Sequence, residues 1–330
     1  MSQRTRCFES ILADCIRAFV AHKRALGYRF DSEEKMFVLL DRYLVEQRVA
    51  GLEELTPAVL DGFLASRSRA PRSYNVLLTT VRRLFDWLVL HEHIERSPLR
   101  AEPRRGSPSL RPFLFDKVQA RRLIEAAERL PDTPCTQMRG ETYAMMFVLL
   151  YALGLRVGEV TRLCGEDIDF DKQLLVVRHT KFSKCRLVPF GPRVESRLQR
   201  FVRERERRLG RLDTDHAVFT FSKDRRRPIR STTVSWTFHK LVVDLGLEPP
   251  PGVRAPHLHC LRHSFAVATL LRWYREGVDP AERLFYLSTF LGHVSPASTA
   301  VYLTITDELL HVANKRYQRF AALMLTEAEP

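Results

Sequence analysis

The chain has 330 residues, which is enough for two domains that each bury a core. Lysine and arginine number 53 against 39 acidic residues, so the formal net charge is +14 and a polyanion such as nucleic acid is the expected partner. A basic host proteome or a need for solubility is the alternative explanation. No apolar run approaches the length of a membrane span and no signal peptide opens the chain, so we expect a cytoplasmic location and no membrane partner.

The cysteines and the paired histidines do not indicate a metal site. None of the six cysteines forms a Cys-x-x-Cys pair, which favours reduced thiols over a disulfide frame or a zinc site. His259 and His263 have the i, i+4 spacing of metal ligands. The glutamate of a zinc-protease helix is missing between them, however, and Arg262 would repel a dication. We therefore expect neither a metal nor a cofactor.

Residues 1–99 are predicted to form a bundle of four short helices. Apolar residues recur with a helical period from Phe8 to Leu26. Each helix has a candidate boundary: Gly27 ends the first, Asp31 with Glu34 resembles a capping box for the second, Thr56-Pro57 opens the third, and Ser73 opens the fourth.

Basic side chains gather at the joints of this bundle and in one later loop. Arginine at helix ends and in loops can reach phosphates, and Tyr74 and Asn75 lie beside Arg72, from where base edges are within reach. A solvated charged face explains any one cluster equally well. The candidate DNA contacts are Arg67, Arg69, Arg72, Tyr74, Asn75, Arg82, Arg225 and Arg226.

Residues 100–112 are predicted to be a basic, proline-rich linker, and residues 113–330 a second domain. In that domain Asp116–Leu130 is an amphipathic helical pattern, and Thr142–Leu153 is nearly all apolar but too short to cross a bilayer, which predicts a buried core helix. A basic helix over residues 193–211 and another starting at Ser231 follow.

One hairpin is predicted between these helices. Leu174–His179 is a strand pattern, and Arg186–Phe190 reads as its returning partner. The turn carries Lys181 and Lys184, and a lysine at a hairpin tip can enter a site as a proton donor. Turn lysines are more often simply solvated.

Groups that can hold and attack a phosphate recur at the ends of the predicted helices. Arg156 follows the core helix between two glycines and needs a partner, either Glu159 or a phosphate. His259 and Arg262 lie three residues apart and share one helical face, and Tyr302 follows His293 by nine positions. Guanidinium groups, imidazoles and a phenol are the parts of a phosphoryl-transfer site with a tyrosine nucleophile. Taken singly, each residue is more often a packed core residue.

Four blocks, in this order, resemble the tyrosine recombinase, or phage-integrase, family. They are Gly154-Leu155-Arg156-Val157-Gly158-Glu159, the hairpin that ends in Arg186-Leu187-Val188-Pro189, His259-Cys260-Leu261-Arg262-His263, and Leu291-Gly292-His293 with Tyr302. The resemblance implies a mainly helical fold with a small β-sheet. It also implies a two-domain clamp on DNA, with residues 1–99 as the core-binding domain and residues 113–330 as the catalytic domain.

The resemblance implies a mechanism and six catalytic residues: Arg156, Lys181, His259, Arg262, His293 and Tyr302. The tyrosine attacks a scissile DNA phosphate to form a 3′-phosphotyrosine, and the two arginines hold the nonbridging oxygens. Lys181 protonates the leaving 5′ oxygen, His259 takes or positions the tyrosine proton, and His293 binds the phosphate or orients the tyrosine. Neither ATP nor a metal is needed, because one ester replaces another.

The sequence departs from the family pattern in two places. Lys181 lacks the glycines that usually flank the family's lysine, since Thr180 and Phe182 stand there. The stretch from Gly277 to Leu291 is about one helical turn longer than usual, which should change how the helix bearing Tyr286 and Leu287 packs.

The resemblance further implies a tetramer on two double-stranded DNA sites, formed by this chain alone or with related recombinase subunits. An amphipathic C-terminal helix from about residue 306 would dock on a neighbouring subunit or on its own domain. Three other functions stay open: a topoisomerase-like enzyme that acts on one duplex, a DNA-binding protein without catalysis, and a basic helical regulator. Integration, excision or transposition of a mobile element is the expected biological role, with chromosome-dimer resolution as the alternative.

Overall fold

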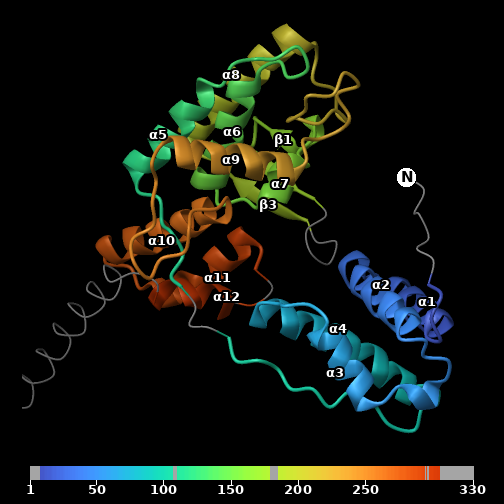
Figure 1. Cartoon of the computed structure of the whole chain (residues 1–330). Coiled ribbons are helices and arrows are strands. Elements are labelled where there is room, and N and C mark those ends of the chain that lie inside the picture. The colour runs from blue at the N-terminus through green and yellow to red at the C-terminus, as the bar shows by residue number, and fades with distance from the viewer. Residues whose placement is uncertain (1–7, 107–109, 179–184, 294, 296, 305–330) are drawn as a thin grey trace, which may run out of the picture. The chain divides into compact units, whose positions relative to one another are not determined.

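The computed structural model describes residues 8–106, 110–178, 185–293, 295 and 297–304. The chain divides into two compact units, Met1–Ser109 and Leu110–Pro330, and each is described by itself (Figure 1). The division falls inside the stretch predicted as a linker. Lys181 and the C-terminal helix predicted from about residue 306 lie outside the described residues.

The first unit contains the four predicted helices: α1 (Ala13–Ala25), α2 (Asp31–Glu46), α3 (Pro57–Ala65) and α4 (Pro71–Leu90). Their apolar faces meet in one core, in which Phe19, Phe37, Phe63 and Phe85 are fully buried. Phe19 meets Phe37 edge to face at 5.8 Å between ring centroids, an arrangement favoured by the ring quadrupole.

Two of the predicted helix boundaries in this unit are wrong. Asp31 and Glu34 form no capping box, because both carboxylates pair with Arg24 and Phe30 begins the helix in the left-handed region with φ at 57°. The fourth helix starts at Pro71, before Ser73, since proline fits the first helical turn. The third boundary is confirmed: the Thr56 hydroxyl accepts a hydrogen bond from the next turn.

The second unit is built on α6 (Arg139–Ala152), in which every residue from Thr142 to Leu150 is buried, as predicted. Around it lie α5 (Lys117–Glu128), α8 (Pro192–Leu209), α9 (Ser231–Asp244) and α10 (His259–Arg275) (Figure 1). The shorter elements are α7 (Val157–Thr161), α11 (Pro280–Leu291), α12 (Ala297–Ala300) and a 3-10 turn (Val301–Thr304). Among the described residues, no helix is long and apolar enough to cross a membrane.

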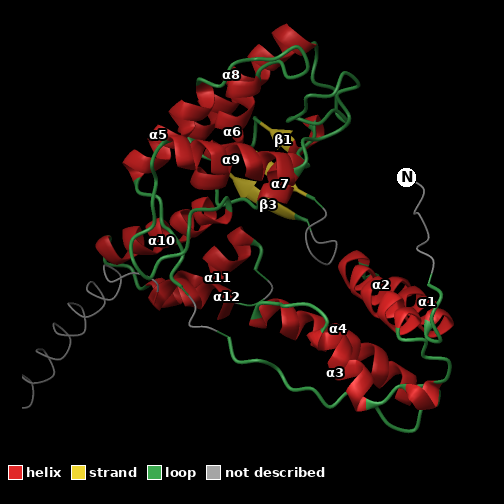
Figure 2. Ribbon diagram, in the orientation of Figure 1, coloured by secondary structure: helices red, strands yellow, loops and turns green. Residues whose placement is uncertain are grey.

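A small antiparallel sheet in the order β1-β2-β3 completes this unit (Figure 2). Strand β2 (Leu174–Val177) pairs with β3 (Arg186–Pro189), with Val177 opposite Arg186, which confirms the predicted hairpin. Strand β1 (Ile168–Asp169) was not predicted, because two residues carry no periodic signal. The mainly helical fold with a small sheet is therefore confirmed.

Some arginines of the basic helix α8 pair with acidic side chains of this unit. Arg197 pairs with Glu128, and Arg208 pairs with both Asp132 and Glu141. One arginine of this helix, Arg205, is buried and donates hydrogen bonds to two backbone carbonyls. Part of the charge of α8 therefore links this helix to α5 and α6.

Phe238→Ala should destabilise the protein by about 3–5 kcal/mol, because the side chain is fully buried between the rings of Phe115 and Phe147. Urea unfolding measures the change. Trp236→Ala is the matched control, since this large residue on the same helix is exposed, and we expect a change within about 0.5 kcal/mol. Equal losses in the two variants would contradict the assigned core.

Candidate active site

Arg262, in the first turn of α10, lies at the centre of the site and is almost completely buried. Its guanidinium donates to the carbonyl oxygen of Gly154 at 2.7 Å and to that of Leu291 at 2.6 Å. Its Nε is buried without a protein partner among the described residues. Burial and the nearby charge of Arg156 lower the pKa of Arg262 to about 10, so it remains a cation at neutral pH.

Three arginines from three elements meet at the carboxyl end of α11. The carbonyls of Phe290, Leu291 and Gly292 accept hydrogen bonds from Arg186, Arg262 and Arg156, at 2.9, 2.6 and 2.8 Å respectively. The last carbonyls of a helix lack intrahelical donors and carry the negative end of its dipole. This helix end therefore gathers three cations immediately before His293.

Glu159 is the counter-ion of this cluster. Its buried carboxylate accepts from the Arg156 guanidinium at 2.8 Å and from both terminal nitrogens of Arg186 at 2.8 Å. Burial alone would raise the pKa of Glu159, but the hydrogen bonds and charge of Arg186, together with Arg156, lower it to about 2. The sequence predicted Glu159 as one of two possible partners of Arg156, the other being a phosphate. It did not predict that Arg186 would also pair with Glu159.

Glu159→Gln should lower the free energy of unfolding by about 3–5 kcal/mol at pH 7, because two guanidinium groups lose their buried counter-ion. The folded carboxyl has a pKa of about 2 against an ordinary 4.5, so its contribution is present in full above about pH 4.5 and is lost as the pH falls toward 2. Urea unfolding should therefore show the gap between wild type and variant closing in acid.

Glu204→Gln is the control for this prediction. Glu204 also has a pKa lowered to about 2, by hydrogen bonds from Arg207 and Arg208, but it lies on the solvated face of α8. Stability at pH 7 should change little, because exposed ion pairs contribute little. A loss in Glu204→Gln as large as that in Glu159→Gln would contradict the role given to the buried carboxylate.

Tyr302 lies in the same cluster and is only 4% exposed. Its hydroxyl is 2.9 Å from Nδ1 of His263, and it is near enough to Arg262 for charge and hydrogen bonding to act on it. Burial nevertheless raises the pKa of the phenol above its ordinary value. The ring of His293 stacks on the tyrosine at 6.3 Å, and its Nδ1 is 2.6 Å from the Thr299 hydroxyl.

The site histidines are neutral at physiological pH. Desolvation lowers the pKa of His259 to about 3, with help from the neighbouring His263 and from the positive charge of Arg262. Desolvation likewise lowers the pKa values of His263 and His293 to about 4. His259 stands at the start of α10 and meets the ring of His263 edge to face at 4.6 Å.

Of the predicted catalytic residues, Arg156, Arg262, His293 and Tyr302 thus lie in one cluster, with His259 joined to it through His263. Two further residues of the cluster, Arg186 and His263, were not predicted to act in it. Arg186 stands in the block that carried the resemblance, and a buried acid at Glu159 signals a need for cations. His263 was weighed only as a metal ligand; its contact with Tyr302 joins residues 39 positions apart.

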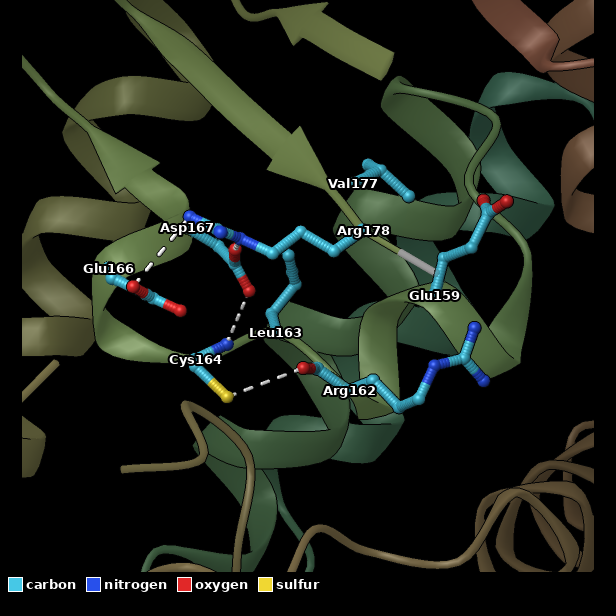
Figure 3. A pocket seen from close by; sticks show the side chains of 8 residues that line it. All are labelled: Glu159, Arg162, Leu163, Cys164, Glu166, Asp167, Val177 and Arg178. Carbon is cyan, nitrogen blue, oxygen red and sulfur yellow. Dashed lines mark hydrogen bonds and ion pairs between the residues drawn. The ribbon is translucent and has the colours of Figure 1, made fainter. Parts of the chain in front are cut away.

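A small cavity of about 110 Å³, lined in part by Glu159, lies between α7 and the end of β2 (Figure 3). Asp167 binds the Arg178 guanidinium at 2.6 Å and the backbone amide of Cys164 at 2.9 Å. These contacts hold Arg178, the last described residue before Lys181 in the sequence. Among the described residues, no three histidine, cysteine or acidic side chains are arranged to hold a metal ion.

Three of the candidate DNA contacts hold the chain's own segment after α4. Asn75 exchanges two hydrogen bonds of 2.8 Å with the backbone of Arg104, and the Arg104 guanidinium lies over the Tyr74 ring at 3.9 Å. Arg82 donates to the Ala101 carbonyl. Of the others, Arg69 donates to the carbonyls of Leu64 and Arg67, and Arg226 pairs with Asp215. DNA contact by these residues stays a prediction.

Comparison with known proteins identifies the group to which the chain is related. Residues 114–308 match the model of the phage integrase family. The chain belongs to the phage integrase family. A putative integrase/recombinase, y4rB of Sinorhizobium fredii, is 31% identical over 94% of this chain and 98% of the relative. The tyrosine recombinase XerA of Thermococcus kodakarensis is 28% identical over 77% of this chain and 78% of the relative.

Solved structures share the fold of this phage integrase family member. The Tn1549 transposon integrase, in complex with a circular intermediate DNA, matches with a TM-score of 0.64 at 15% identity, over 94% of this chain and all of that one. The lambda integrase, as a dimer bound to a core site, matches with a TM-score of 0.60 at 19% identity, over 88% of this chain and 76% of that one. The family and its relatives make this protein a site-specific DNA recombinase of the tyrosine type.

Proposed function

We propose that the cluster around Arg262 is the active site at which this recombinase breaks and rejoins DNA. The observation that carries the proposal is the convergence of Arg156 and Arg262, 106 positions apart, on the carbonyls of adjacent residues, Gly292 and Leu291, beside the Tyr302 phenol. Two fixed cations beside a nucleophile suit a phosphodiester, whose negative charge spreads over two nonbridging oxygens.

In the proposed reaction the Tyr302 oxygen attacks the scissile phosphorus, and the 5′ oxygen of the DNA leaves. Arg156 and Arg262 stabilise the charge that grows on the nonbridging oxygens, and Lys181 gives its proton to the leaving oxygen. His293, held by Thr299 and stacked on the tyrosine, orients the phenol. Attack by a 5′ hydroxyl from a second strand reverses the step and joins new partners.

The wild-type protein tests this function on a duplex that it selects from random-sequence DNA. A nick beside the cleavage position lets the short 5′ fragment diffuse away, so the protein should remain covalently attached to the 3′ end. Two selected duplexes of different length should exchange ends. Relaxation of one supercoiled duplex without exchange would favour a topoisomerase-like enzyme, and tight binding without any adduct would favour a regulator.

The proposal includes a tetramer on two DNA sites. An open groove of about 930 Å³ runs along α10 and is lined by apolar residues such as Leu114, Phe265 and Leu271, with Asp116 and Arg272 among its charged residues. A neighbouring copy's C-terminal segment, apolar on one side in its sequence, is the proposed occupant. Sedimentation of the protein with selected DNA should give four protomers on two duplexes; one protomer per duplex at saturation would contradict the tetramer.

The proposed biological role is movement of a mobile element by integration, excision or transposition. The relatives named as integrases and the structural likeness to a transposon integrase support it. A cytoplasmic location belongs to the same proposal, because the chromosome is the substrate. Sequencing the DNA that flanks the gene tests the role: repeats or further recombinase genes are expected, and a solitary gene with a single nearby recombination site would favour chromosome-dimer resolution.

A further inference from the structure

The Tyr302 hydroxyl has a histidine partner that the resemblance to the family does not assign. Nδ1 of His263 lies 2.9 Å from the phenol oxygen, within hydrogen-bond distance. The two rings are 5.5 Å apart, so the contact is direct. When Nε2 carries the ring proton, Nδ1 accepts this hydrogen bond and the phenol donates it.

The other site histidines have no such contact among the described residues. His259 touches the ring of His263, and among the described residues it makes no hydrogen bond to the phenol. His293 stacks flat against the tyrosine, and its Nδ1 is engaged by Thr299. Of these three histidines, His263 is therefore the one with a ring nitrogen within hydrogen-bond distance of the phenol oxygen.

We propose that His263 is the catalytic residue that accepts the Tyr302 proton during attack on the DNA phosphate. This inference rests on the proposed function of the site. As the bond between Oη and phosphorus forms, the Oη–H bond breaks and its proton moves to Nδ1 of His263. The bond from phosphorus to the 5′ oxygen breaks, and that oxygen takes a proton from Lys181. In the rejoining step His263 returns the proton to the phenol, so the histidine is regenerated.

The charges around His263 suit a base that works only with substrate bound. Arg262 and His259 face it from its own helix, Arg254 and His257 from the preceding loop, and Tyr302 and His293 from the segment after α11. Burial and the charges of His257, Arg262 and Arg254 lower the pKa of His263 to about 4. The imidazole is thus neutral and free to accept. A DNA phosphate between the arginines offsets their charge, which raises the basicity of His263 toward the range that suits general base catalysis.

His263→Asn tests the inference because its amide oxygen replaces Nδ1 as an acceptor but cannot take up a proton. On the nicked, self-selected duplex, single-turnover adduct formation at pH 7 should slow by about 10²–10⁴-fold. The wild-type rate should be nearly flat above about pH 7, whereas the variant rate should climb by about tenfold per pH unit as free phenolate becomes the nucleophile. A variant within about threefold of wild type, or one with a flat profile, would overturn the proposal.

A duplex with sulfur in place of the bridging 5′ oxygen separates this role from that of the acid. Because sulfur leaves without protonation, a variant that lost only the acid for the leaving group would form the adduct at the wild-type rate on this duplex. If His263→Asn did so, the proposal would be overturned. In His259→Asn the rate of adduct formation should stay nearly flat above about pH 7, as in the wild type. If His259→Asn, and not His263→Asn, showed a rate that climbs with pH, His259 would be the residue that accepts the proton.

Two measurements keep the test valid if His263→Asn folds poorly. Thermal unfolding and binding of the selected duplex verify that the variant is native. With the wild type, D₂O should still slow adduct formation on the sulfur duplex, because the phenol proton remains in transfer; an unchanged rate would contradict the proposal. If the wild type forms no adduct at any pH, the proposed function fails. If the wild type forms the adduct and His263→Asn forms it equally fast, only the role of His263 is contradicted.

Discussion

Phenylalanine at position 302 should leave a folded, DNA-binding protein that forms no covalent bond with DNA. The substitution removes one oxygen from a side chain that is 4% exposed and leaves the ring packed against His293. The lost hydrogen bond to His263 should cost about 1 kcal/mol of stability. No adduct with the nicked duplex should be detected, because the nucleophilic atom is gone.

Tyr286→Phe is the matched control for this result. Tyr286 lies on α11, which ends beside the site, but its side chain is exposed. Adduct formation should equal that of the wild type. An adduct that persists in Tyr302→Phe and vanishes in Tyr286→Phe would move the nucleophile to α11 and remove the assignment of Tyr302.

Local sequence patterns predicted the parts of the site that lie within short blocks. Arg156 could be identified because a charge that follows a nearly all-apolar helix needs a partner, either Glu159 or a phosphate. His259 and Arg262 could be paired because helical spacing puts them on one face. The buried helix α6 and the β2–β3 hairpin were predictable because an apolar run and a strand pattern are local, and the family resemblance implied the fold class.

Contacts between distant segments could not be predicted in the same way. Arg186 joins Glu159 across 27 positions, and it does so because β3 pairs with β2 so that its first residue reaches α7. The capping box failed at Asp31 for a related reason: Arg24, on the preceding helix, takes both carboxylates. In each case a tertiary partner decided between local alternatives of similar energy.

The stretch before Leu291, expected to be about one turn longer than in the family, contains the helix α11. Leu287 packs with Ala266 and Leu270 of α10, so the helix is anchored on one side. Tyr286 and its neighbour Phe285 face outward. The helix thus presents these two side chains to solvent and ends at the three arginine-bound carbonyls of the site.

Arg262→Ala should reduce the rate of adduct formation by about 10²–10³-fold or more, the usual effect of removing one preorganised donor to a developing oxyanion. The same change leaves the carbonyl oxygens of Gly154 and Leu291 without the guanidinium that donates to them. At about 1–3 kcal/mol for each buried acceptor left without a donor, the free energy of unfolding should fall by about 2–6 kcal/mol. Activity and stability must therefore be separated.

Arg205→Ala separates them. Arg205 is as deeply buried as Arg262, and it likewise donates to two backbone carbonyls, those of Ala217 and Val218. Its removal should cause a similar loss in urea unfolding. Assayed well below both melting temperatures, Arg205→Ala should cleave at nearly the wild-type rate while Arg262→Ala does not. Equal activity of the two variants would mean that Arg262 serves only to hold the backbone, because the loss of a cation beside Tyr302 would then have no chemical consequence.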